Sequence, residues 1–143
     1  MKTFLLDINV LLALGWSHHV HHNLAHAWLG NLPPCRLAHC TVTQLGFVRI
    51  GLLTEFSPAK ASVADLRARL NTFFAAHDSV FLREPENGIH DHNLTARIEA
   101  VLTSSQLTDA YLAGLADLNK AVVATLDKSL VTRHRAVAEL LQA

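Results

Sequence analysis

The sequence has no excess of charge of either sign, because 12 Lys and Arg residues balance 12 Asp and Glu residues over 143 residues. A chain without a net basic field can bind a polyanion only through local cations or a bound metal. Cysteine is scarce as well. Cys35 and Cys40 cannot form a four-cysteine zinc site, and a strand between them would point them to opposite faces. We therefore expect reduced, structural thiols and a cytoplasmic protein.

Long apolar runs are also missing, since Asp7 and Asn9 interrupt the stretch from Phe4 to Trp16. The interruption argues against a membrane span and against a secretory signal at the N-terminus, so no membrane partner is expected. Half of the residues are nevertheless apolar, which is enough to bury the core of one domain over residues 1–143.

Strand-like and helix-like patterns alternate along the chain. Strands are predicted at residues 2–6, 36–40, 80–82 and 121–125, and helices at residues 8–14, 18–29, 43–53, 57–76, 94–102 and 108–118. Residues 84–93 are predicted to form a polar loop, and the tail from Ser129 to be largely helical. This alternation predicts an α/β fold with a mostly parallel central sheet that is covered on both faces.

Three aspartates stand where a carboxylate is costly unless it has a partner. Asp7 and Asp127 each follow an apolar strand, and Asp109 stands at the start of a helix. In open α/β sheets, ligands bind outside the carboxyl ends of the strands. Carboxylates gathered there repel one another, and a divalent cation removes the repulsion. Oxygen-only ligands favour Mg²⁺ or Mn²⁺ over zinc, so the pattern predicts metal-assisted phosphate chemistry.

Four stretches of the chain carry a resemblance to a known family. Residues 5–12 (LLDINVLL) resemble the opening of a PIN domain, residues 108–113 its late acidic helix start, and residues 124–128 its last acidic strand end. Residues 43–49 (TQLGFVR) further resemble the branch that contains the VapC-type toxins of bacterial toxin–antitoxin pairs. The likeness spans nearly the whole chain and implies a single PIN-like domain, an α/β/α sandwich.

The resemblance implies a Mg²⁺- or Mn²⁺-dependent endoribonuclease, the toxin of a type II toxin–antitoxin pair. Such an enzyme hydrolyses cellular RNA, often tRNA, through a metal-activated water. Matched position by position, Asp7, Asp109 and Asp127 correspond to the metal-site acids. Asn9 and Thr125 match polar residues that accompany the first and the last of these acids.

Protein partners are implied in the same way. Toxins of this kind are blocked by a cognate antitoxin protein that covers the cleft, and they commonly form homodimers. We expect the helix predicted at residues 57–76 to contribute to a two-fold interface.

Gln44 joins the three aspartates as a candidate catalytic residue, although the family commonly has a glutamate there. An amide oxygen can accept a hydrogen bond from a metal-bound water, but it carries no charge and cannot act as a general base. The chain is then either an enzyme with one protein-held metal, or a weakened or silent PIN module that binds RNA or protein. Arg49 either anchors a carboxylate or the scissile phosphate or lies at the surface.

Structural roles remain open for the same acids. Asp7 could cap the helix that follows it, and Asp109 could favour a helix start through the helix dipole. A response-regulator-like domain with a phosphoryl-accepting aspartate is a further alternative, in which Lys128 would serve beside Asp127.

Histidines recur at a helical spacing of four residues, at His18, His22 and His26. On one helix face they could bind zinc, contact the substrate or simply be solvated. Histidines that are partly protonated near neutral pH would also help to attract RNA.

Overall fold

A computed structural model of the chain describes residues 1–53 and 60–142. Within these residues a five-stranded sheet has the order β3-β2-β1-β4-β5, and every neighbouring pair is parallel. The predicted α/β class is therefore confirmed. The strands are β1 (Lys2–Leu6), β2 (Cys35–His39), β3 (Ser79–Phe81), β4 (Val122–Thr125) and β5 (Ala138–Leu140).

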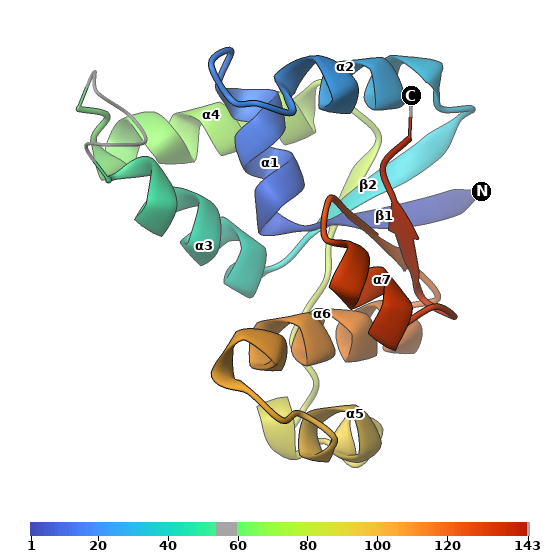
Figure 1. The fold of residues 1–143 in the computed structure, drawn as a ribbon. Coiled ribbons are helices and arrows are strands. Elements are labelled where there is room, and N and C mark those ends of the chain that lie inside the picture. The colour runs from blue at the N-terminus through green and yellow to red at the C-terminus, as the bar shows by residue number, and fades with distance from the viewer. Residues whose placement is uncertain (54–59, 143) are drawn as a thin grey trace.

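Helices cover both faces of the sheet (Figure 1). On one face lie α1 (Ile8–Gly15), α2 (His22–Asn31), α3 (Thr41–Gly51) and α4 (Val63–Ala75). On the other lie α5 (Thr95–Glu99), α6 (Leu107–Leu118) and α7 (Lys128–Arg133). Short 3₁₀ turns at Gly88–His90 and Ser104–Gln106 flank α5. The α/β/α sandwich is confirmed.

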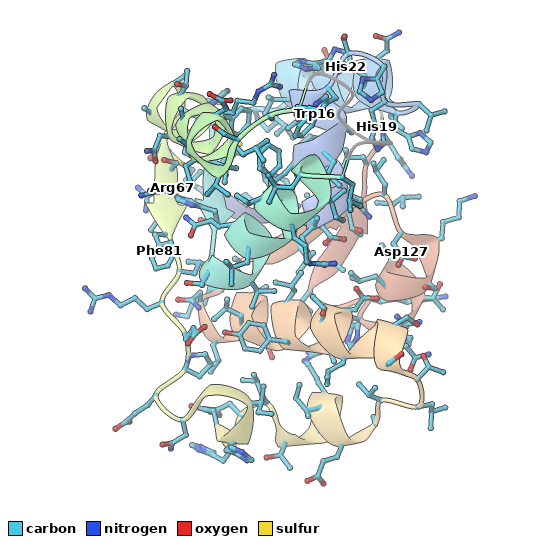
Figure 2. All side chains as sticks on the ribbon, turned by 90° about the vertical axis from the view of Figure 1, so that its left-hand side faces the viewer. Trp16, His19, His22, Arg67, Phe81 and Asp127 are labelled. Carbon is cyan, nitrogen blue, oxygen red and sulfur yellow. The ribbon has the colours of Figure 1, made fainter. Side chains whose placement is uncertain are left out.

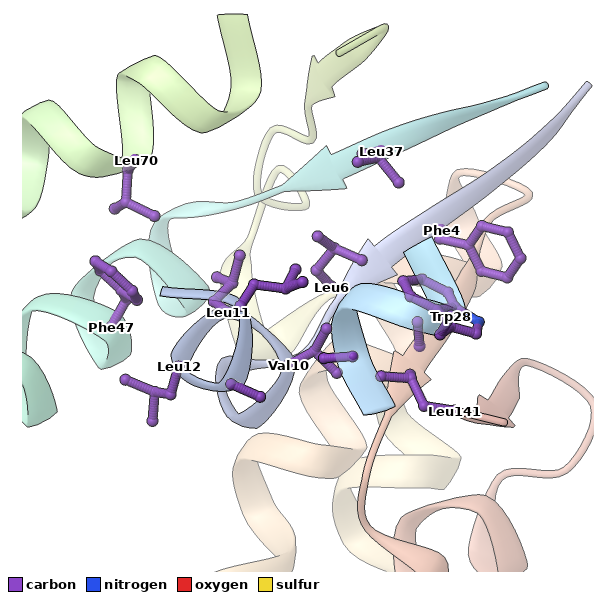
Figure 3. Close-up of a cluster of buried hydrophobic side chains, with 14 of the residues drawn as sticks. Phe4, Leu6, Val10, Leu11, Leu12, Trp28, Leu37, Phe47, Leu70 and Leu141 are labelled. Carbon is purple, nitrogen blue, oxygen red and sulfur yellow. The ribbon is translucent and has the colours of Figure 1, made fainter. Parts of the chain in front are cut away.

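Strand β1 is apolar because it lies in the middle of the sheet and is buried on both faces. Phe4 and Leu6 point into the cluster beneath α1 to α4, whereas Leu5 points into the cluster beneath α6. Figure 3 shows Phe4 and Leu6 among side chains of α1 and α2, including Val10 and Trp28. The alternation of side chains along a strand thus explains why an uninterrupted apolar run is needed here.

The C-terminal tail differs from its prediction. Helix α7 ends at Arg133, and β5 follows as an edge strand parallel to β4 instead of a longer helix. Ala138, Glu139 and Leu140 have no strong intrinsic strand preference, so pairing with β4 decides their conformation. Local pattern alone could not predict this.

The largest differences between predicted and observed helix starts are at α2 and α4. Helix α2 begins at His22, so His18 lies outside it. Helix α4 begins at Val63, because Ser62 and Asp65 form a capping box that fixes its first turn. The predicted start at residue 57 lies outside the described residues.

The cysteines are free thiols, as expected, and Cys40 is buried. None of the helices in the described part of the chain is long and apolar enough to cross a lipid bilayer.

Candidate active site

The central strands β1 and β4 deliver two of the three aspartates to one edge of the sheet. Asp7 directly follows β1, Asp127 lies two residues after β4, and the Asp7 amide donates to the Ala124 carbonyl at 3.0 Å. Helix α6 leads into β4, so its N-terminal turn with Asp109 lies toward the same edge. Figure 2 faces this edge and shows Asp127 at a level between α3 and α6.

Asp7 is buried, with 6% of its surface exposed, and is held at both oxygens. Its Oδ1 accepts the Ile8 amide at 2.7 Å, which makes it the N-cap of α1, and its Oδ2 accepts the Thr125 hydroxyl at 2.7 Å. Burial raises the pKa of Asp7, and the charge of Asp127 adds to the rise, while the two hydrogen bonds oppose it. The proposed capping role of Asp7 is therefore real, but it does not remove the cost of the buried charge.

Thr125 connects the polar side chains of the site. This fully buried hydroxyl donates to Asp7, accepts the Asp127 amide at 3.0 Å, and lies 3.4 Å from the amide nitrogen of Asn9. Asn9 Oδ1 accepts the Leu126 amide at 3.2 Å. Asn9 and Thr125 thus tie the end of β1 to the end of β4, which orients Asp7.

Asp127 has the opposite electrostatic environment. Its Oδ1 caps α7 by accepting the Ser129 amide and hydroxyl, each at 2.8 Å, and the Leu130 amide at 3.3 Å. Burial opposes the charge, but these hydrogen bonds outweigh burial and lower the pKa of Asp127. Within the described residues no hydrogen bond reaches Oδ2, so that oxygen is available to a ligand.

Asp109 carries the clearest sign that the three acids interact. Burial, and next the charges of Asp7 and Asp127, raise its pKa from 3.8 to about 6. Arg133 opposes the rise through an ion pair of 2.9 Å between its Nη2 and Asp109 Oδ2. One guanidinium therefore does not neutralise the surplus negative charge of this cluster.

The donor set fits a divalent cation in charge and chemistry. Among residues 1–53 and 60–142, no group of three His, Cys, Asp or Glu side chains is already arranged to hold a metal ion. One reason is that Asp109 Oδ2 forms an ion pair with Arg133. Three mutually repelling carboxylates are nevertheless suitable oxygen ligands for Mg²⁺ or Mn²⁺. Asp109 would have to exchange Arg133 for the metal.

The raised pKa of Asp109 predicts a pH-dependent stability in the absence of metal. The folded chain binds the proton more tightly than the unfolded chain, so this group's contribution to the free energy of unfolding falls as pH rises from 3.8 to about 6. Asp109→Asn should therefore raise that free energy by about 1 kcal/mol near pH 7.5, after allowance for partial exposure, and change it little near pH 4.

Urea denaturation in EDTA at both pH values measures this difference. Asp78→Asn is the matched control, because it removes an exposed carboxylate that pairs with Arg36 at 3.2 Å and should give no gain. If Asp109→Asn lowers stability at both pH values, the ionised carboxylate is favourable and the proposed repulsion does not exist.

Gln44 lies in α3, where its Nε2 is 2.9 Å from His39 Nδ1. The His39 ring stacks on Phe74 with centroids 3.9 Å apart, and burial lowers its pKa, so the neutral ring accepts the amide proton. Within the described residues no hydrogen bond joins Gln44 to the aspartates. A position of Gln44 at the border of the acidic cleft stays a prediction.

In the part of the chain that the structure describes, no hydrogen bond or ion pair joins Arg49, His22 or His26 to the three aspartates. Arg49 is exposed near the end of α3, which matches the surface alternative.

His22 and His26 contact the carbonyl oxygens of Ala13 and Leu14 at 2.8 and 3.0 Å, so they complete the C-terminal end of α1. Figure 2 shows His22 well away from Asp127. A single zinc-binding helix face is therefore wrong, since His18 precedes α2.

Sequence reasoning missed Arg133 and Ser129, which bind Asp109 and Asp127. Ser129 had a recognisable signal, because a serine two residues after an aspartate that ends a strand is a common capping arrangement. Arg133 had none, since its ion pair depends on how α7 packs beside α6. Asp117, a remote acidic residue of α6, is an exposed partner of Arg97 at 3.5 Å.

No family model matches the chain, but individual proteins do. Ribonuclease VapC38 of Mycobacterium tuberculosis is 30% identical over 128 residues, 90% of this chain and 87% of that protein. Ribonuclease VapC29 of the same species is 34% identical over 141 residues, 97% of this chain and 96% of that protein. A crystal structure of VapBC2 from Rickettsia felis, bound to a promoter DNA fragment, has a TM-score of 0.57 at 12% identity, over 97% and 98% of the two chains.

Proposed function

The chain belongs to the VapC family of PIN-domain ribonucleases, and from this premise we propose that it is a divalent-metal-dependent endoribonuclease. It would act as the toxin of a type II toxin–antitoxin pair on cellular RNA, with tRNA as one candidate. The observation that carries the proposal is that Asp7 and Asp127 follow neighbouring parallel strands at one edge of the sheet, with Asp109 close to both. Burial, and next the charges of Asp7 and Asp127, raise the pKa of Asp109 to about 6. A bound cation would offset the repulsion among these carboxylates.

Each residue of the site has a task in this mechanism. Bound Mg²⁺ or Mn²⁺ would supply a water of lowered pKa and offset charge on the attacked phosphate. Asp7, Asp109 and Asp127 would hold the ion. Thr125 and Ile8 restrain the Asp7 carboxylate, while Asp127 keeps Oδ2 available because its other oxygen caps α7. Attack of water on phosphorus would break the bond to the 3′ oxygen, which takes up a proton, and would leave a 3′-hydroxyl on one product and a 5′-phosphate on the other.

Two protein partners belong to the proposal. One solved structure with a similar fold is a VapBC assembly on promoter DNA, which supports a cognate antitoxin for this chain. Self-association is supported by exposed apolar side chains on or beside α3 and α4, namely Leu45, Leu52, Leu53 and Val63. The predicted interface at residues 57–76 begins outside the described residues.

A cleavage assay tests the activity itself. Purified full-length chain should cut end-labelled tRNA with Mg²⁺ or Mn²⁺, and EDTA should abolish the reaction because the carboxylates alone cannot activate water. The downstream product should be ligated without prior phosphorylation by a kinase. Such ligation would show that its 5′ end already carries a phosphate. Cleavage that persists undiminished in EDTA would contradict the metal mechanism.

A further inference from the structure

A cavity of about 320 Å³ lies among α5, α6 and α7, beside the acidic cluster. Figure 1 shows these helices together on the face of the sheet opposite α1 to α4. Its lining includes the small apolar side chains of Ala96, Ala100 and Val101. It also includes the guanidinium groups of Arg97 and Arg133 and the imidazole of His134. The volume is at the lower end for ligand sites and suits one ring-sized group.

Two cations and a buried ring converge in this cavity. Arg97 Nη1 lies 3.0 Å from His134 Nδ1, and only 8% of the His134 surface is exposed. Burial and then the charges of Arg97 and Arg133 lower the pKa of His134, so the ring is neutral. Because Nδ1 accepts from Arg97, the proton of the neutral ring is on Nε2. The polar lining is thus rich in donors, although each arginine also pairs with a carboxylate, Arg97 with the exposed Asp117 at 3.5 Å and Arg133 with Asp109 at 2.9 Å. An anionic, acceptor-rich ligand would compete with these two carboxylates for the arginines.

Arg133 connects the cavity to the proposed metal site. It lines the cavity, and it also forms the 2.9 Å ion pair with Asp109. Ala110, the residue after Asp109, lines the cavity as well. A group in the cavity therefore lies directly beside one of the three acids. If Asp109 turns to a cation, Arg133 loses its partner and becomes free to bind another anion.

We propose that this cavity is a nucleotide subsite, which holds a residue of the RNA strand next to the scissile phosphate. The proposal rests on the proposed ribonuclease function. The unstacked base would lie against Ala96, Ala100 and Val101 and beside the planar guanidinium of Arg97, while Arg133 would bind the adjoining phosphate. In an electrically neutral chain, local cations of this kind would add to what a bound metal contributes to RNA binding.

RNA binding by the full unmutated chain in Ca²⁺, a hard cation that takes the same oxygen ligands as Mg²⁺ but polarises water less, tests the subsite with the three aspartates intact. Arg97→Gln should raise the dissociation constant for a single-stranded oligoribonucleotide about tenfold and reduce the salt slope by about 0.7. Ala100→Trp should also raise it about tenfold by filling the cavity, but should leave the slope unchanged because no charge is removed.

Matched controls separate these effects from general damage. Arg36→Gln removes an ion-paired arginine of β2, and Ala76→Trp places the same bulk on another exposed helix C-cap; each should change binding less than about twofold. If the parent binds RNA and all four variants bind equally well, the subsite is wrong and the ribonuclease proposal stands. If the parent binds no RNA, both proposals fail.

Discussion

Asp7→Asn is expected to reduce metal-dependent RNA cleavage by about 100-fold or more, because it removes a charged ligand and keeps the side-chain shape. Folding should survive. The asparagine oxygen can still accept the Ile8 amide as the cap of α1, and burial already disfavours the charge of Asp7. Initial rates with Mg²⁺ or Mn²⁺, together with a urea denaturation curve, measure both expectations. Growth inhibition on expression should be relieved in parallel.

A suitable control is Asp65→Asn, which also changes an aspartate that caps a helix. Asp65 is exposed and binds only the first turn of α4, so its replacement should cost some stability and leave cleavage unchanged. Asp7→Asn cleaving RNA at the parent rate would show that this carboxylate does not hold the metal.

Gln44→Glu is expected to change activity in the opposite direction, with about a tenfold gain in metal affinity or in rate at low Mn²⁺. The substitution restores a fourth carboxylate at the position where the family commonly has one. It also replaces the donor that binds His39 Nδ1, so the ring must carry its proton on that nitrogen to keep the contact. Cleavage rates over a Mn²⁺ titration measure the gain.

Asn23→Asp is the matched control, because it makes the same amide-to-carboxylate change at an exposed position near the start of α2. If the natural chain cleaves nothing and Gln44→Glu does, the protein is a silenced nuclease that acts by binding. If Gln44→Glu changes neither metal affinity nor rate, the side chain does not face the metal.

The central strands and two of the three acids followed from local pattern. Residues 2–6 are apolar throughout because β1 is buried on both faces, and Asp7 directly follows it. The same argument holds for β4 and Asp127. Such signals are strong, because burial on both faces leaves little freedom in the choice of side chain.

The remaining features depend on tertiary packing and were not predictable in the same way. Strand β5 exists because β4 offers an edge, and the ion pair of Arg133 with Asp109 requires α7 to lie beside α6. His22 and His26 have a helical spacing, but their partners are carbonyl groups of α1 rather than a metal. Residue spacing along one helix cannot show which group from another element meets it.

The most direct test of the central claim is an anomalous diffraction measurement on crystals of the chain grown with Mn²⁺. We expect a peak at about 2.0–2.6 Å from carboxylate oxygens of Asp7 and Asp127, with Asp109 turned from Arg133 toward the ion. Crystals of Asp7→Asn under the same conditions should lose the peak. A Mn²⁺ peak elsewhere, or none at this edge of the sheet at saturating metal, would contradict the claim that the three aspartates form a metal site.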